Sequence, residues 1–262
     1  ITGFYEMAQH LFFVGTKSGL YYGAKDYLKN NKVDAIIATG SPHVLFKYAS
    51  DLSKKNGIPW IADYRDPWSQ SSSRSRNALL KRWNSFFEIR YLKNVKNIVT
   101  VSGFLVYKIS SLIKNKPFEI VMNGYNPDYS DTYKHIKQGS DVLQIAFVGT
   151  IYQWHQITSV LRQFNNFIKS NPDLEIQINF YGINKEDYIN KLINLEFPSL
   201  KSAIKIQPKI NNQELLKILA EQNLMLLFND YSLHGTKIFD YLALKRRILL
   251  CYFCKINRYE LK

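Results

Sequence analysis

Apolar residues along the chain follow two alternating patterns, short continuous runs and longer stretches with helical spacing. The short runs predict strands at 33–39, 58–62, 97–101, 118–122, 143–148, 175–180, 203–207, 223–228 and 247–250. The longer stretches predict helices near 42–55, 77–93, 103–114, 155–169, 185–194, 211–221 and 236–244. Strands that are apolar throughout belong to parallel sheets covered by helices, so the pattern predicts a doubly wound α/β fold.

One polar segment interrupts this alternation. Residues 125–142 contain Asn, Pro, Gly, Asp and Ser and show no apolar period, and a new strand and turn, LQIAFVGT, follow directly. The sequence therefore predicts two domains, 1–124 and 143–262, joined by a linker at 125–142. In open α/β sheets, ligands bind beyond the carboxyl ends of the strands.

Composition and charge limit the classes of partner that we expect for this chain. With 46% hydrophobic residues the chain can form a core, and its net charge of +14 favours anionic partners. Residues 1–124 hold 18 Lys and Arg against 8 Asp and Glu. These basic residues form no known nucleic-acid motif, so we expect no nucleic-acid partner. No apolar run approaches the ~18–20 residues that span a bilayer, and no signal peptide is visible, which predicts a cytoplasmic protein.

The only two cysteines, Cys251 and Cys254, lie close together near the end of the chain. A zinc site needs more ligands than this pair supplies, and a redox motif normally opens a helix after an early strand. We therefore expect two ordinary reduced thiols and no metal.

The segment IADYRDPWS, residues 61–69, places several polar side chains directly after an apolar run. Arg65 can bind a phosphate or a carboxylate through two parallel hydrogen bonds. Asp63 or Asp66 can orient a sugar hydroxyl, and Trp68 can stack on an apolar sugar face. The alternative is a structural Asp–Arg pair that caps the following loop.

The segment FVGTIYQWHQ, residues 147–156, joins a strand to a helix that we expect to start near His155. Gly149 allows a tight turn, and backbone N–H groups at a helix start favour an anion such as a diphosphate. Gly149 and Thr150 are therefore candidate ligands. A G-x-G-x-x-G fingerprint is absent, which argues against a dinucleotide dehydrogenase.

The segment NDYSLHGTKIFDYLA, residues 229–243, contains a polar turn with Gly235 and then a predicted helix. Thr236 can cap this helix. A cation such as Lys237 in the first turn is unfavourable beside the helix dipole unless an anion binds there. Asp240 lies three residues later on the same side. This spacing suits a nucleotide-sugar; the alternative is a single exposed ion pair.

Together these segments resemble the GT-B glycosyltransferases of the large "group 1" retaining class, particularly bacterial envelope-polysaccharide enzymes with a D-[FY]-R-D-P-W segment. The resemblance covers about residues 33–250, and the segments run in family order: WIADYRDPWS (60–69), VTVS (99–102), VMNG (121–124), FVGTIY (147–152) and TKIFDYLALKRRILL (236–250).

The resemblance implies two Rossmann-like domains, an acceptor-side one and one that binds a nucleotide-sugar. It implies transfer to a glycan or lipid-linked acceptor with retention, without a cofactor. Three residues fall in the transfer site: Asp63, Arg65 and Asp66. The donor side comprises Gly149, Thr150, Ser232, Gly235, Thr236, Lys237 and Asp240. Ser232 stands where the family has its first motif acid, and Asp240 replaces the usual glutamate. Both domains are expected to be incomplete, before residue 33 and after Leu250.

Two other functions stay open. An inactive sugar- or nucleotide-binding fragment is favoured by Ser232 and by the incomplete domains. A GT-B-fold sugar epimerase would need proton-transfer groups on both faces of the sugar, and only the DYRDPW segment offers obvious ones. Binding and turnover of nucleotide-sugars would separate these functions.

Residues 74–96 carry seven Lys and Arg but one Glu. Within them Leu80, Trp83, Phe87 and Tyr91 recur on one helical face. Leu79 and Phe86 widen that face, and the basic residues Arg82, Arg90 and Lys93 flank it. Such a helix can lie on an anionic inner membrane leaflet, or its apolar face can pack on the sheet. Docking through this apolar face requires Trp83 and Phe87 to be exposed.

Overall fold

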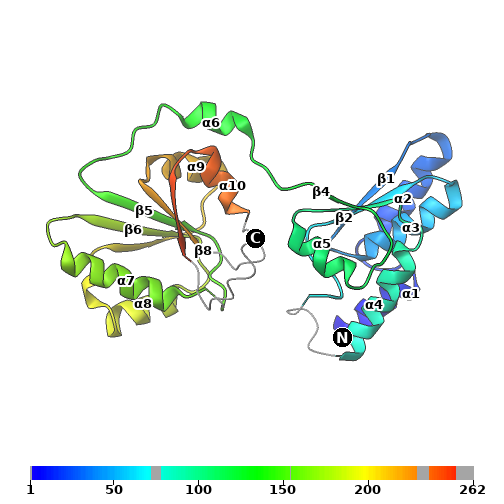
Figure 1. The fold of residues 1–262 in the computed structure, drawn as a ribbon, viewed down its shortest axis with the longest axis horizontal. Coiled ribbons are helices and arrows are strands. Elements are labelled where there is room, and N and C mark those ends of the chain that lie inside the picture. Colours follow the sequence, from blue (N-terminus) through cyan, green and yellow to red (C-terminus); the bar gives the residue numbers. More distant parts are fainter. Residues whose placement is uncertain (1, 72–77, 154, 229–235, 252–262) are drawn as a thin grey trace. The chain divides into compact units, whose positions relative to one another are not determined.

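A computed structural model of the chain describes residues 2–71, 78–153, 155–228 and 236–251. The chain divides into two compact units, Ile1–Met122 and Asn123–Lys262 (Figure 1). Each unit is built on one sheet in which all neighbouring strands run parallel. This confirms the fold class that the hydrophobic pattern predicts.

The first unit contains a four-stranded sheet with the order β1-β2-β3-β4. Its strands are β1 (Ile36–Gly40), β2 (Trp60–Tyr64), β3 (Asn97–Thr100) and β4 (Phe118–Ile120). The connecting helices are α3 (Val44–Asn56), α4 (Ala78–Leu92) and α5 (Gly103–Ser110). Ser102 caps α5, as a serine before a helix commonly does, because its hydroxyl accepts from the backbone N–H of Leu105.

Two helices that the sequence did not predict precede this sheet, α1 (Thr2–Leu11) and α2 (Ser18–Asn30). α2 contains Gly19 and Gly23, which weaken an isolated helix. Tertiary contacts compensate: Tyr21 is buried, and its hydroxyl donates to Asp51 of α3 at 2.6 Å.

The core of the first unit lies on one face of its sheet. Ala38, Ala62 and Ile98 are cross-strand neighbours in register, and all three are buried with side chains of α3, α4 and α5. On the opposite face Ile37 is 68% exposed.

The second unit contains a five-stranded sheet with the order β7-β6-β5-β8-β9. Its strands are β5 (Leu143–Val148), β6 (Ile176–Tyr181), β7 (Ile204–Gln207), β8 (Leu224–Phe228) and β9 (Arg247–Cys251). The helical segments are α6 (Pro127–Tyr133), α7 (Ile157–Ser170), α8 (Glu186–Leu195), the short 3₁₀ segment η1 (Pro198–Leu200), α9 (Asn212–Glu221) and α10 (Lys237–Ala243). From β5 the chain winds outward through β6 and β7, then returns to place β8 on the other side of β5.

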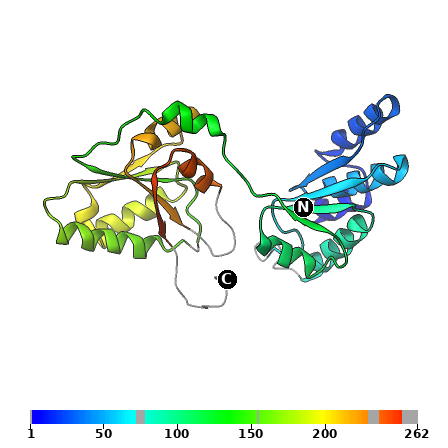
Figure 2. The ribbon, with the colours of Figure 1, turned by 45° about the horizontal axis from the view of Figure 1, so that its top comes forward.

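Helices cover both faces of this second sheet. Ile145 and Phe147 of β5 face a core that includes side chains of α7 and α8. Ala146, between them in sequence, faces a second core formed with α9 and α10. Figures 1 and 2 show the two helix pairs on opposite sides of the strands. Burial on both faces explains why these strands read as continuous apolar runs.

Helix α6 lies within the segment that the sequence predicted to be a linker. Asn126 caps it by accepting from the N–H of Asp128 at 3.1 Å, and Pro127 occupies the first turn. Tyr129 and Tyr133 pack against the core that contains α9 and α10. None of the helices in the described ranges is long and apolar enough to cross a membrane.

Candidate functional site

Asp63 lies near the carboxyl end of β2, on the sheet face opposite the core. Strand pairing sets it beside Thr39, whose hydroxyl donates to Asp63 Oδ2 at 3.0 Å. Arg65 Nε donates to the same oxygen at 3.0 Å. Asp63 is 6% exposed, and among the described residues its Oδ1 has no hydrogen-bond partner. Buried carboxylate oxygens rarely lack a hydrogen-bond partner, and this marks Asp63 as a candidate functional group.

The other two predicted residues of this loop are more accessible. The side chain of Arg65 is 41% exposed, and Asp66 is exposed. The Asp63–Arg65 ion pair is the contact expected of a structural pair, so the geometry agrees with both interpretations of this segment.

Trp68 does not face solvent, and the expectation that it stacks on a sugar is wrong. Its ring contacts two histidine rings, of which His43 stacks at a centroid distance of 5.0 Å and an interplanar angle of 2°. His10 stacks at 5.3 Å and 29°. Trp68 is 6% exposed, so it anchors the loop in the core of the first unit.

Glu88 of α4 was not singled out from the sequence, yet it holds this loop from inside. Its carboxylate is fully buried and accepts hydrogen bonds from the hydroxyl of Tyr64 at 2.8 Å and the amide of Gln70 at 3.1 Å. It also accepts from the backbone N–H and the hydroxyl of Ser69. Burial raises the pKa of the Glu88 carboxyl, while the bonds from Ser69, Gln70 and Tyr64 oppose that rise. A signal did exist: Glu88 lies three residues before Tyr91 on the apolar side of its helix.

In the second unit, Gly149 follows β5 in a conformation that favours glycine. Its φ is 106°, and its N–H donates to the carbonyl of Tyr181 at 3.0 Å. The next turn is fixed by Asn184, whose side-chain oxygen accepts from the N–H of Ile151 at 2.8 Å. Thr150, which lies between Gly149 and Ile151, is exposed.

Helix α7 starts at Ile157, two residues after the predicted start. His155 instead belongs to the preceding loop, where its ring stacks on Phe228 of β8 at 4.9 Å. This contact ties the Gly149 loop to the end of the neighbouring strand. His155 is thus an anchor within the second unit.

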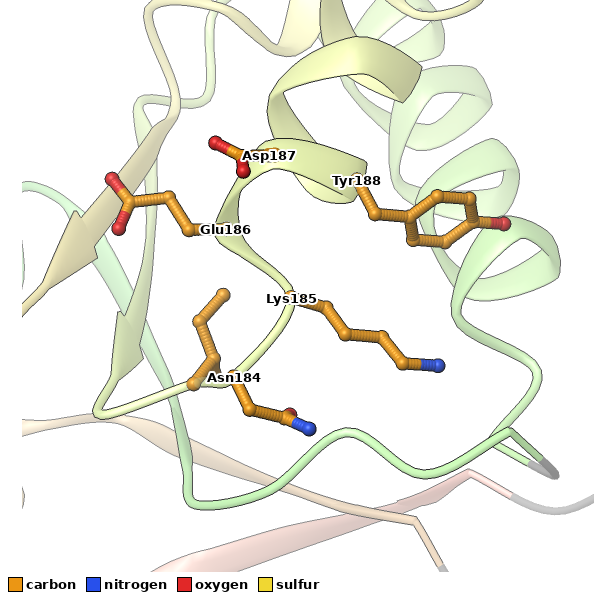
Figure 3. Close-up of a pocket in the computed structure, with 6 residues that line it drawn as sticks. Asn184, Lys185, Glu186, Asp187 and Tyr188 are labelled. Carbon is orange, nitrogen blue, oxygen red and sulfur yellow. The ribbon is translucent and has the colours of Figure 1, made fainter.

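Asn184 also lines a surface depression of about 500 Å³ at the start of α8. Figure 3 shows Lys185 and Tyr188 pointing to one side and Glu186 and Asp187 to the other. The carboxylates of Glu186 and Asp187 lie in the first turn of α8, where the helix dipole favours negative charge, so they would repel a further anion. The depression is therefore poorly suited to a diphosphate.

Lys237 and Asp240 form an ion pair at the start of α10. Lys237 Nζ lies 2.9 Å from Asp240 Oδ2, and the side chains are 34% and 22% exposed. Both groups are accessible to a ligand. Thr236 does not cap the helix as expected, because it has helical backbone angles and its side chain makes no capping bond. Ser232 and Gly235 lie outside the described residues.

The strand order places the Gly149 loop and the start of α10 at one edge of the sheet. β5 and β8 are parallel neighbours, and the order in which the chain adds strands to the sheet reverses between them, which makes this the topological switch point. The Gly149 loop follows β5, and the segment leading to Lys237 follows β8. Ligands of open α/β sheets bind in the crevice that such a reversal creates.

Comparison with known proteins identifies the fold. No family model and no curated protein sequence matches the chain. The solved structure of sucrose-phosphate synthase from Thermosynechococcus elongatus is similar, with 12% identity and a TM-score of 0.64, over 88% of this chain and 59% of that chain. The pneumococcal O-GlcNAc transferase GtfA, solved with UDP and GlcNAc, has 12% identity and a TM-score of 0.59, over 91% of this chain and 45% of that chain.

The chain has the GT-B fold. It spans less than two thirds of either of these glycosyltransferases. The same fold also occurs in a putative UDP-N-acetylglucosamine 2-epimerase from Listeria monocytogenes, with 8% identity and a TM-score of 0.52, over 89% of this chain and 61% of that chain. Fold likeness at this level does not separate transfer from epimerisation.

Proposed function

We propose that this chain is part of a glycosyltransferase that moves a sugar from a nucleotide-sugar to a glycan or lipid-linked acceptor. Retention of configuration, a role in cell-envelope polysaccharide synthesis and a cytoplasmic location belong to the same proposal. The observation that carries it is the position of the donor candidates. Gly149 and the Lys237–Asp240 pair follow the two strands on either side of the switch point.

On the donor side, each group has a distinct task in this proposal. The positive φ of Gly149 and its missing side chain let a diphosphate approach the backbone of the loop. Lys237 balances the diphosphate charge, and Asp240 accepts hydrogen bonds from the ribose hydroxyls. Ligand binding would then replace part of the ion pair between these two side chains.

On the acceptor side, the transfer site is proposed to use Asp63, Arg65 and Asp66. Asp63 holds Arg65 through Nε. The guanidinium, so oriented, can bind an anionic group of a substrate through its remaining N–H groups. Asp66, which is exposed, orients a sugar hydroxyl.

The donor assignment can be tested by titrating the chain with UDP, GDP and their sugars in a calorimeter. A ligand that binds the folded chain also raises its stability, by about 2.7 kcal/mol at a hundredfold excess over Kd. Asp240→Asn should weaken nucleotide binding about tenfold, equivalent to ~1.4 kcal/mol. The matched control is Asp131→Asn, which breaks the exposed Asp131–Lys134 pair of the same i,i+3 spacing.

An unchanged dissociation constant for Asp240→Asn, or an equal loss in the control, would remove Asp240 from the donor site. If no nucleotide in the panel binds, the donor proposal fails for this chain.

A sugar epimerase is the second candidate, because a protein of that description shares the fold. Asp63 and Asp66 would then have to move protons at the sugar carbon. The two activities differ in their products. A transferase releases nucleoside diphosphate when an acceptor is present, whereas an epimerase changes the donor sugar without one. Binding without either product would indicate an inactive fragment.

A further inference from the structure

Helix α4 has two faces with different environments. Its inner face packs into the first unit: Phe87 and Tyr91 are each 5% exposed, and Trp83 packs partly buried beside them. Membrane docking through this apolar face, one of the two expectations from the sequence, is therefore wrong. A different set of side chains points outward, and we refer to it as the outer stripe: Leu79, Arg82, Phe86, Ile89, Arg90 and Lys93.

The outer stripe combines large apolar and basic side chains on one helical face. Spacings of three and four residues align the first five along α4, and Lys93 follows directly after the helix ends at Leu92. Leu79 is 71% exposed, Phe86 57% and Ile89 49%. Exposed apolar side chains grouped in this way, rather than scattered, indicate an interaction surface.

All charged side chains of the outer stripe are positive. The only acid of α4, Glu88, points into the core, where it binds Tyr64, Ser69 and Gln70. Within the described ranges, no ion pair involves Arg82, Arg90 or Lys93. The stripe thus presents three cations to an anionic partner.

We propose that the outer stripe docks the first unit on an anionic lipid bilayer. Arginine and lysine side chains contact the headgroup phosphates, and Leu79, Phe86 and Ile89 enter the boundary between headgroups and acyl chains. A polyanion such as nucleic acid would satisfy the cations but leave the three apolar side chains in water. A second copy of the chain, paired stripe to stripe, would bring like charges together.

This docking does not depend on the proposed sugar transfer. It does place the bilayer on the outer side of the helix whose inner side holds the DYRDPWS loop through Glu88. The lipid part of a lipid-linked acceptor would lie in that same bilayer.

Co-sedimentation with vesicles tests the proposal without an activity assay. The probes are vesicles of phosphatidylcholine and vesicles of phosphatidylcholine mixed with phosphatidylglycerol. We expect binding to the mixed vesicles only. The double variant Arg82→Glu/Arg90→Glu should lose about tenfold or more of this binding, because each basic residue at the surface contributes to it. Phe86→Ser should weaken binding as well, and most visibly at high salt, where the electrostatic part is screened.

Helix α7 supplies matched controls in the second unit, since Arg162, Phe167 and Lys169 are also exposed. Arg162→Glu/Lys169→Glu and Phe167→Ser should bind vesicles like the unchanged chain. Thermal unfolding checks that each variant is folded. Equal binding to neutral vesicles, or an equal loss in the α7 charge variant, would overturn the proposal. Binding that Phe86→Ser leaves unchanged at every salt concentration would show a general polyanion surface and would also overturn it.

Discussion

The carboxylate of Glu88 accepts a hydrogen bond from the hydroxyl of Tyr64 at 2.8 Å, deep in the first unit. Tyr64 is the last residue of β2, and the chain turns there into the loop with Arg65 and Asp66. The same carboxylate fixes Ser69 at the far end of that loop. One buried acid on α4 therefore holds both ends of the candidate transfer loop.

Replacing Glu88 should destabilise the first unit. Glu88→Ala leaves the buried hydroxyl of Tyr64 and the N–H of Ser69 without an acceptor, at a cost on the order of 3 kcal/mol. Glu88→Gln should cost less because it keeps one acceptor oxygen. Urea unfolding followed by tryptophan fluorescence measures both. The exposed Glu119→Gln in the same unit is the control, and equal stability of the Glu88 and Glu119 variants would contradict the buried network.

The stability of the first unit should fall in mild acid because of His10. Burial, and then the nearby charge of Lys47, lower the pKa of His10 from 6.5 to about 4. Between these values the unfolded chain binds a proton that the folded chain does not, so folding weakens as pH falls from 6.5 to 4. The full effect is on the order of 3 kcal/mol.

His10→Phe keeps a ring against Trp68 but removes this titration. Its unfolding free energy should therefore change less across the window than that of the unchanged chain. His135→Gln, at an exposed position, should behave like the unchanged chain. Identical pH profiles for His10→Phe and the unchanged chain would count against a buried neutral His10.

Gly149→Ala should destabilise the second unit through its backbone alone. A Cβ at this position meets no atom within 4 Å, so the cost comes from the positive φ of 106°. We expect a loss of about 1–2 kcal/mol. Gly139→Ala is the matched control, because its Cβ also meets nothing and its φ is not in the left-handed range. Calorimetric unfolding compares the two, and equal melting temperatures would refute the backbone argument.

Arg65→Ala should lower turnover far more than donor affinity if Arg65 acts on the reacting centre. Lys55→Ala removes the comparable Asp51–Lys55 pair, at 2.8 Å, and should leave turnover unchanged. The measurement is steady-state kinetics beside a donor titration. A loss of unfolding free energy with normal turnover would show that the Asp63–Arg65 pair is structural.

The hydrophobic pattern predicted the strands well because most of them are apolar on both faces. All nine predicted strands overlap observed ones, and β5 agrees at both ends. The helices α1 and α2 were missed because tertiary contacts, such as that of Tyr21 with Asp51, stabilise a segment with weak local signals. In α6, the Asn126–Pro127 start signal was present, but the helix is short and has few apolar residues.

The candidate site was only partly visible in the sequence. Spacing placed Asp63 and Arg65 together and paired Lys237 with Asp240, since both pairs are close along the chain. It failed for Trp68, because a tryptophan in a polar loop gives no sign that two distant histidines stack against it. For Glu88, helical spacing marked a position on the apolar side of α4, but the sequence showed no sign of its partners, which lie 18–24 residues away.

The central claim, that a nucleotide-sugar binds at the switch point between β5 and β8, is tested most directly by hydrogen exchange with and without UDP. Peptides that cover 147–153 and 236–244 should exchange more slowly when UDP is bound. Peptides that cover the depression at 183–188 and helix α9 should change little. Protection confined to 183–188, or to the first unit, would contradict the claim.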